Sequence, residues 1–110
     1  MSKLILIPTP IGNLSDITER AIESIKTVDL LLCEDTRRSL KLLNHLKIKK
    51  QLQSYHKFNE HSIVEKIINK IQSGIKVGLI SDAGTPSISD PGYLIVKLCI
   101  NNDVEVECLP

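Results

Sequence analysis

Cysteines and long apolar runs are both scarce in this sequence of 110 residues. The three cysteines, at positions 33, 99 and 108, include no CxxC pair, which excludes a disulfide scaffold and a structural zinc module. We expect all three to be reduced and buried. No apolar run approaches the roughly 20 residues of a membrane-spanning helix, and the apolar stretch near Met1 is too short for a signal peptide. These absences favour a single cytoplasmic globular domain.

Glycine-rich nucleotide-binding signatures are also absent. No GxGxxG follows the first predicted strand, and no GxxxxGK[ST] occurs in a chain with five glycines. A Rossmann dinucleotide site and a P-loop are therefore disfavoured. A receiver-type phosphoacceptor is disfavoured as well, because the first strand ends in Pro8-Thr9-Pro10 instead of an acidic pair.

The adjacent carboxylates of Glu34 and Asp35 are the pair best placed to hold a metal ion. Adjacent side chains of an extended chain alternate in direction, which works against joint coordination. We therefore expect no metal site. Instead, we expect one carboxylate to cap the following helix and the other to pair with Arg37 or Arg38.

The net charge of +1 conceals a strongly basic segment. Residues 37–57 contain seven Lys or Arg and no Asp or Glu, whereas the rest of the chain carries seven basic and thirteen acidic residues. This segment is either a solvated basic face or a patch that binds the phosphates of a nucleic acid. With one Phe, two Tyr and no Trp, RNA binding here would act mainly on the backbone.

Short apolar runs alternate with segments of helical spacing along the chain. Residues 4–7, 30–33, 77–80 and 104–109 predict strands, the first of them an apolar run buried on both faces, and residues 51–55 predict a weaker strand. The segments between them predict helices at about 16–28, 36–46, 62–74 and 90–101. This alternation predicts an α/β domain of right-handed βαβ units, with a mostly parallel sheet.

Local signals mark the ends of the predicted helices. Two pairs match the capping box that starts a helix, Asp16 with Glu19 and Ser62 with Glu65. Gly74 matches a C-terminal cap, and Asp90-Pro91 matches an N-cap followed by proline in the first helical position. Helix 36–46 should turn three leucines toward the core, at positions 40, 43 and 46.

The loops at the carboxyl ends of the predicted strands concentrate Gly, Pro, Asp, Thr and His. They span residues 9–13, 34–37, 55–60 and 81–92, and this edge of a parallel sheet carries the functional groups. Loops 9–13 and 81–92 together predict a preformed cleft for a small organic ligand; the alternative is a merely structural crossover loop. His56 is placed to touch a substrate, His45 should lie on the surface, and Tyr55 is either core or site.

Four of these segments carry a family resemblance. TPIGNL at 9–14, EDTR at 34–37, SYH at 54–56 and SDAGTP at 81–86, followed by ISDPG at 88–92, occur in this order. The chain resembles the small-subunit ribosomal RNA methyltransferase family of the tetrapyrrole methylase superfamily, over its whole length. That family has a second α/β domain. We therefore expect residues 1–110 to be the amino-terminal domain, with the carboxy-terminal domain absent from this chain and the isolated piece inactive.

The resemblance implies a fold and a reaction. It implies a five-stranded parallel sheet in the order 3-2-4-1-5 with helices on both faces. It also implies S-adenosylmethionine as cofactor and, as acceptor, the 2′-hydroxyl of a cytidine in the decoding region of small-subunit (16S) rRNA. The implied cofactor contacts are Pro10, Ile11 and Gly12 in one loop and Asp82, Ala83, Gly84, Thr85, Pro86 and Ile88 in the other.

A ribose hydroxyl is a poor nucleophile, so methyl transfer would gain from a general base. Four residues at the correct edge are candidates, and the choice among them stays open: Asp82, Glu34, Asp35 and His56. We expect RNA contacts from Arg37, Arg38, Lys41 and Lys57, and we expect a homodimer. Two alternatives remain, a domain that methylates a tetrapyrrole carbon and a non-enzymatic flavodoxin-like binding module.

Overall fold

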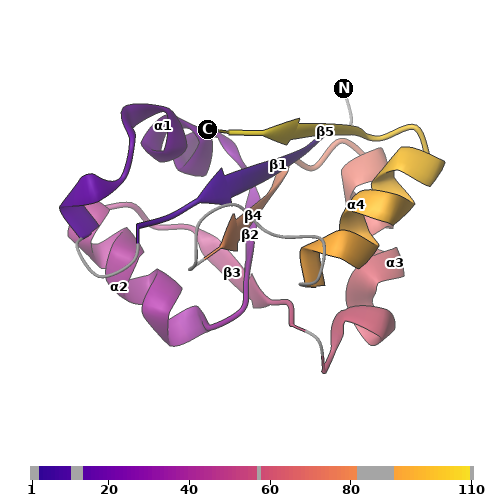
Figure 1. The fold of residues 1–110 in the computed structure, drawn as a ribbon, viewed down its shortest axis with the longest axis horizontal. Helices are drawn as coiled ribbons and strands as arrows, with labels where there is room; N and C mark the ends of the chain where they lie inside the picture. The colour runs from indigo at the N-terminus through magenta and orange to yellow at the C-terminus, as the bar shows by residue number, and fades with distance from the viewer. Residues whose placement is uncertain (1–2, 11–13, 57, 82–90, 110) are drawn as a thin grey trace.

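The computed structural model describes residues 3–10, 14–56, 58–81 and 91–109. They form a five-stranded sheet flanked by helices (Figure 1). The strands are β1 (Lys3–Pro8), β2 (Leu30–Cys33), β3 (Gln51–Ser54), β4 (Val77–Ser81) and β5 (Glu105–Cys108). The helices are α1 (Glu19–Thr27), α2 (Thr36–Leu46), α3 (Glu60–Gln72) and α4 (Pro91–Asn101), and a short 3-10 turn, η1 (Leu14–Asp16), precedes α1.

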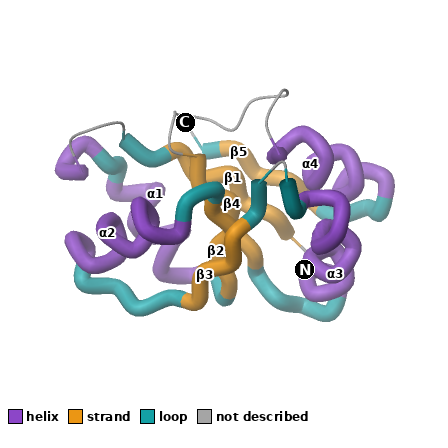
Figure 2. Tube along the Cα trace, turned by 90° about the horizontal axis from the view of Figure 1, so that it is seen from below, coloured by secondary structure: helices purple, strands orange, loops and turns teal. Residues whose placement is uncertain are grey.

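The sheet has the predicted topology. Its strands follow the order β3-β2-β4-β1-β5 and every neighbouring pair is parallel. Figure 2 shows α1 and α2 on one side of the stacked strands and α3 and α4 on the other. In the part of the chain that is described, no helix is both long and apolar enough to cross a membrane.

Both faces of the sheet are buried, which explains why its central strands are apolar throughout. In β1, Leu4 and Leu6 pack in one cluster with α3 and α4. Ile5 and Ile7 point the other way and pack in a second cluster with α1 and α2. Since successive side chains of a strand face opposite sides, only a continuous apolar run satisfies both clusters.

Two predicted helix starts are wrong, each by a few residues. The N-cap of α1 is Thr18 and not Asp16, because Asp16 ends η1 while the Thr18 hydroxyl accepts a hydrogen bond from the Ala21 amide at 3.1 Å. Helix α3 begins at Glu60, ahead of the expected cap at Ser62. The turn before it is already held by Asn59, whose side chain accepts a hydrogen bond from the His56 amide and donates one to the Ser54 carbonyl.

The predicted end of α3 is confirmed. The Gly74 amide donates to the Ile71 carbonyl at 3.0 Å, and the Ile75 amide donates to the Lys70 carbonyl at 3.1 Å. These two bonds form a Schellman motif, whose turn needs a positive φ. Gly74 supplies it with φ 107°.

Two side chains depart from the predicted burial. Leu40 is 51% exposed, because α2 turns Leu42 and Leu43 toward the core instead. Cys108 is exposed on β5, the last strand of the sheet, whereas Cys33 and Cys99 are buried as expected. Pro91 begins α4 as predicted, while its expected cap, Asp90, lies outside the described residues.

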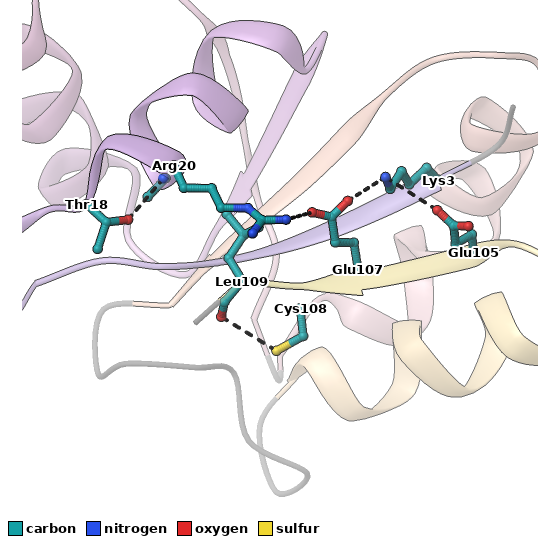
Figure 3. A network of polar contacts seen from close by, with 8 residues as sticks. Lys3, Thr18, Arg20, Glu105, Glu107, Cys108 and Leu109 are labelled. Carbon is teal, nitrogen blue, oxygen red and sulfur yellow. Dashed lines mark hydrogen bonds and ion pairs between the residues drawn. The ribbon is translucent and has the colours of Figure 1, made fainter.

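An ion-pair network ties β5 to the rest of the molecule (Figure 3). Lys3 on β1 lies 3.4 Å from a Glu105 carboxylate oxygen and also contacts Glu107. Arg20 on α1 reaches the other Glu107 oxygen at 3.3 Å. The Lys3 ammonium and then the Arg20 guanidinium hold the pKa of Glu107 below its ordinary value, and hydrogen bonding to Glu107 raises the pKa of Lys3.

Candidate functional site

A polar pocket of about 400 Å³ opens at the carboxyl ends of β2 and β3. It lies there because the two strands pair in parallel with Cys33 opposite Ser54, so that the residues following each strand emerge side by side. The Tyr55 amide extends the pairing by donating to the Cys33 carbonyl at 2.8 Å. The lining residues are Glu34, Asp35, Thr36, Arg37, Ser54, His56 and Phe58.

This pocket unites residues that were predicted from two separate loops. Glu34, Asp35 and Arg37 come from the loop after β2, and His56 comes from the loop after β3. Phe58 also lines the pocket, although it was not among the predicted site residues. Its signal in the sequence is its position, two residues after His56 in a loop at the carboxyl edge.

One carboxylate of the acidic pair carries both roles that were expected of two. Asp35 caps α2, since its Oδ1 accepts a hydrogen bond from the Arg37 amide at 2.9 Å, and the same oxygen lies 3.7 Å from Arg37 Nε. The backbone hydrogen bond from Arg37 lowers the pKa of Asp35. Glu34 is exposed and has no hydrogen bond or ion pair with the other residues that the structure describes.

His56 is held by a hydrogen-bonded turn. Its amide donates to Asn59 Oδ1 at 2.8 Å, and Asn59 Nδ2 donates back to the Ser54 carbonyl at 3.0 Å. The His56 ring accepts a hydrogen bond at Nδ1 from the Phe58 amide at 3.2 Å. A neutral imidazole has one donor and one acceptor nitrogen, so neutral His56 carries its proton on Nε2 and presents a donor there.

The basic residues of the predicted RNA patch separate into two groups. Arg37, Arg38 and Lys41 are exposed on the first half of α2, next to the pocket. Lys50 has a structural task, because its ammonium donates to the carbonyls of Lys26 and Val28 at the C-terminal end of α1. Lys57, also predicted to bind RNA, lies outside the described residues.

Tyr55 belongs to the core and not to the site. Its side chain is 1% exposed and packs in the cluster that α3 and α4 cover. Burial, with the nearby Glu60 carboxylate, raises the pKa of its hydroxyl well above the ordinary value. Tyr55 therefore stays a neutral phenol. His45 is exposed, as expected.

The predicted cofactor loops leave neighbouring strands. β1 and β4 pair in parallel with Pro8 opposite Ser81, so the chain departs from both strands at the same point of the carboxyl edge. Pro10 is half-buried beside the buried Thr9. The remaining predicted contacts lie outside the described residues: Ile11, Gly12, Asp82, Ala83, Gly84, Thr85, Pro86 and Ile88. Within the described ranges, no three His, Cys, Asp or Glu side chains gather closely enough to hold a metal ion.

Comparisons with known proteins point in one direction. The model of the family described as Tetrapyrrole (Corrin/Porphyrin) Methylases matches residues 3–110. The chain is 52% identical over 110 residues to the "Ribosomal RNA small subunit methyltransferase I" of Mycoplasmopsis pulmonis, covering 100% of this chain and 50% of that protein. Identity to the Thermotoga maritima protein of the same name is 48%, with the same coverage. The chain thus spans about half the length of the curated relatives it matches.

A solved structure shares the fold at much lower sequence identity. The uroporphyrin III C-methyl transferase of Thermus thermophilus superimposes with a TM-score of 0.72 at 18% identity. The match covers 98% of this chain and 48% of that one. At this level of identity the likeness concerns the fold alone.

Proposed function

The chain belongs to the tetrapyrrole (corrin/porphyrin) methylase family, and from this premise we propose that it forms the amino-terminal half of an rRNA methyltransferase. The methyl donor is S-adenosylmethionine. The acceptor is the 2′-hydroxyl of a cytidine in the decoding region of small-subunit (16S) rRNA, and the protein acts in the cytoplasm. The identity of 46–52% to proteins named for small-subunit rRNA carries this proposal.

The charge distribution supports an RNA acceptor over a tetrapyrrole. The exposed cations of α2 lie beside the pocket and face solvent, as phosphate-binding side chains must. The structural likeness to a porphyrin C-methyl transferase comes with only 18% identity. A flavodoxin-like binding module is disfavoured by the family match over residues 3–110.

We assign the cofactor to the loops after β1 and β4. These neighbouring strands end in register at Pro8 and Ser81, so both loops start at one place on the carboxyl edge, where parallel sheets bind their ligands. The proposed contacts are Pro10, Ile11 and Gly12 in the first loop and residues 82–86 with Ile88 in the second. The bound S-adenosylmethionine supplies a methyl group activated by a positively charged sulfur. The task left to the chain is to align the ribose oxygen with that methyl group.

The hydrogen bonds of the pocket rank the candidate bases. Asp35 is a weak base, because its cap bond lowers its pKa. Neutral His56 presents a proton at Nε2, so it is better suited to donate to a phosphate or ribose oxygen. Glu34 lies in the same pocket and has no hydrogen bond or ion pair with the other residues that the structure describes. We therefore propose Glu34 as the general base, with Asp82 as its rival.

Methyl transfer to undermethylated small ribosomal subunits tests the reaction. The full-length protein should move label from S-adenosylmethionine to the 2′-oxygen of one cytidine in 16S rRNA, located by mass spectrometry. Glu34→Gln should lower kcat with little change in KM, whereas Glu23→Gln, an exposed residue on α1, should not lower kcat. A full-length protein that modifies no ribose, or that modifies a tetrapyrrole instead, would overturn the proposal.

The RNA patch has a separate test. Replacing Arg37, Arg38 and Lys41 together by Ala should weaken RNA binding and flatten its dependence on salt, because fewer counterions are released. The matched control removes three exposed lysines from α3 and α4, namely Lys66, Lys70 and Lys97. If both triple variants give the same salt slope, α2 does not bind phosphates.

We also propose that residues 1–110 provide one wall of the cofactor site and that the remaining half of the relatives' length provides the other. Half a cleft leaves one side of the ligand in water, without the alignment that methyl transfer needs. Residues 1–110 alone should therefore give no turnover. As a separate expectation, the full-length protein should elute from a sizing column as a homodimer. Methylation by the 110 residues alone would contradict the two-wall arrangement.

A further inference from the structure

Phe58 lies at the pocket with most of its ring in solvent. Its side chain is 85% exposed, more than that of any other large hydrophobic residue in the described part of the chain. A single exposed apolar residue is common on protein surfaces and says little by itself. The surroundings of Phe58 are what make it informative.

The backbone that carries the ring is held by hydrogen bonds. The Phe58 amide is hydrogen-bonded to His56 Nδ1 at 3.2 Å, and the His56 and Phe58 rings meet edge to face with centroids 5.9 Å apart. The Asn59 side chain fixes the same turn through the His56 amide and the Ser54 carbonyl. An aromatic ring on such a turn is presented to solvent in advance, which lowers the entropic cost of binding.

The charges around the ring favour different parts of an RNA strand at different places. Inside the pocket, the carboxylates of Glu34 and Asp35 repel a phosphate group. At its edge, the Arg37 side chain is 92% exposed and attracts one. A strand therefore fits with its backbone along α2 and with a neutral, flat base turned inward.

We infer that Phe58 is a stacking platform for an unpaired base of the RNA substrate. The inference rests on the proposed function. The scarcity of aromatic residues predicted contacts mainly with the RNA backbone, and Phe58 adds a contact with a base. A pocket of about 400 Å³ has the size of a small-ligand site, which is typically about 300–1,000 Å³. The base must be unpaired, because a stacked duplex exposes no base face.

A protein partner is the rival occupant of this surface. Docking a protein here would bury the carboxylates of Glu34 and Asp35, and protein interfaces are depleted in Glu and Asp. The basic residues of α2 beside the pocket favour a polyanion instead.

Binding of short RNAs to the full-length protein, measured by fluorescence anisotropy, tests the inference. The probes are a single-stranded oligoribocytidine and an RNA duplex of equal charge. Phe58→Ala should weaken binding of the single strand roughly five- to a hundred-fold, the range that base–aromatic stacking accounts for, and should leave the duplex affinity unchanged. Phe58→Trp should restore the single-strand affinity. Arg37→Ala should weaken both probes and reduce the salt slope, which Phe58→Ala should not.

The matched control is Ile100→Ala, which removes a 64% exposed apolar side chain from α4 and should change neither affinity. Equal single-strand affinities for Phe58→Ala and the wild type would overturn the inference. So would an effect of Phe58→Ala on self-association alone, which would assign the ring to a protein interface. If the full-length protein still methylates 16S rRNA in either case, the proposed function stands without the platform. If stacking is observed but no rRNA is methylated, the proposed function fails separately.

Discussion

Gly78 and Gly74 are both restricted to glycine, for different physical reasons. Gly78 lies in the central strand β4, where a Cβ atom would sit 2.9 Å from Ile7 Cδ1 and 3.1 Å from Leu31 Cδ2. Gly74 has nothing within 4 Å of such an atom, but its φ of +107° disfavours any L side chain. Space is the constraint at the first position and backbone conformation at the second.

Substitution of these two glycines should therefore respond differently to repacking. We expect Gly78→Val to lower the free energy of unfolding by about 1–3 kcal/mol, and Gly78→Ala by less, because the ends of Ile7 and Leu31 can move aside. Gly74→Ala should cost about 1 kcal/mol through its positive φ. Adding Ile7→Val, which removes the clashing Cδ1, should rescue Gly78→Ala but not Gly74→Ala, as measured by urea unfolding. Equal rescue of both would contradict this division.

At the scale of elements, the first turns of the helices depend on which of several capping side chains takes the backbone amides. Asp16 and Thr18 both suit an N-cap by residue type, yet only Thr18 bonds the third amide of α1. Asp16 closes the 3-10 turn that precedes the helix. The competition is settled by backbone direction, since Thr18 has the extended φ and ψ of a cap, −75° and 155°.

This assignment predicts unequal effects of neighbouring substitutions. Thr18→Ala should lower the free energy of unfolding by about 1 kcal/mol, because the Ala21 amide in the first turn of the helix loses its partner. Thr18→Ser keeps the hydroxyl and should restore most of this stability. Asp16→Ala should cost less than Thr18→Ala in the same denaturant titration. A larger loss of unfolding free energy for Asp16→Ala would mean that Asp16, the residue that the sequence pattern favoured, is the N-cap.

At the scale of the whole molecule, charge is segregated between its two edges. The exposed cations of α2 lie beside the β2–β3 end of the sheet. At the opposite edge, β5 contributes Glu105 and Glu107, which bind Lys3 and Arg20. The near-neutral net charge therefore combines an exposed basic side at α2, which attracts a polyanion, with ion pairs at the opposite edge that hold β5 to β1 and α1.

The pH dependence of stability should report on this fastening. Because the pKa of Glu107 is lowered from its ordinary value of 4.5, ionised Glu107 stabilises the fold above about pH 4.5. This contribution is lost as the pH falls through the pKa of the folded state. Because the pKa of Lys3 is raised from its ordinary value of 10.5, protonated Lys3 stabilises the fold below about pH 10.5. This contribution is lost as the pH rises through the pKa of the folded state. The network is thus most effective from about pH 5 to about pH 10.

Glu107→Gln should consequently unfold at lower denaturant concentration than the wild type at pH 7. The difference should shrink below about pH 4 and in 1 M salt, which screens exposed charges. Glu105→Gln, which removes only the 3.4 Å contact to Lys3, should have a smaller effect. A difference that persists unchanged at pH 3 would mean that Glu107 stabilises β5 by packing and not by charge.

The sequence by itself determined the α/β architecture, because strand and helix periodicity are local properties. The predicted strands match the observed ones to within about one residue at each end, and a continuous apolar run predicted burial on both faces, as in β2 (Leu30–Cys33). The order 3-2-4-1-5 came from the family resemblance, since periodicity carries no information on which strands are neighbours. Gly74 and Pro91 also marked helix ends correctly, because each acts through its own backbone.

Only the tertiary structure decided which side chains meet and what each is used for. The loops after β2 and β3 form one pocket because their strands pair, and this contact brings Phe58 to the acidic pair. The same folding commits Asp35 to a cap and Lys50 to the end of α1, and it turns Leu40 outward. These outcomes depend on contacts between residues far apart in the chain. A local pattern supplies the candidates, and long-range packing selects among them.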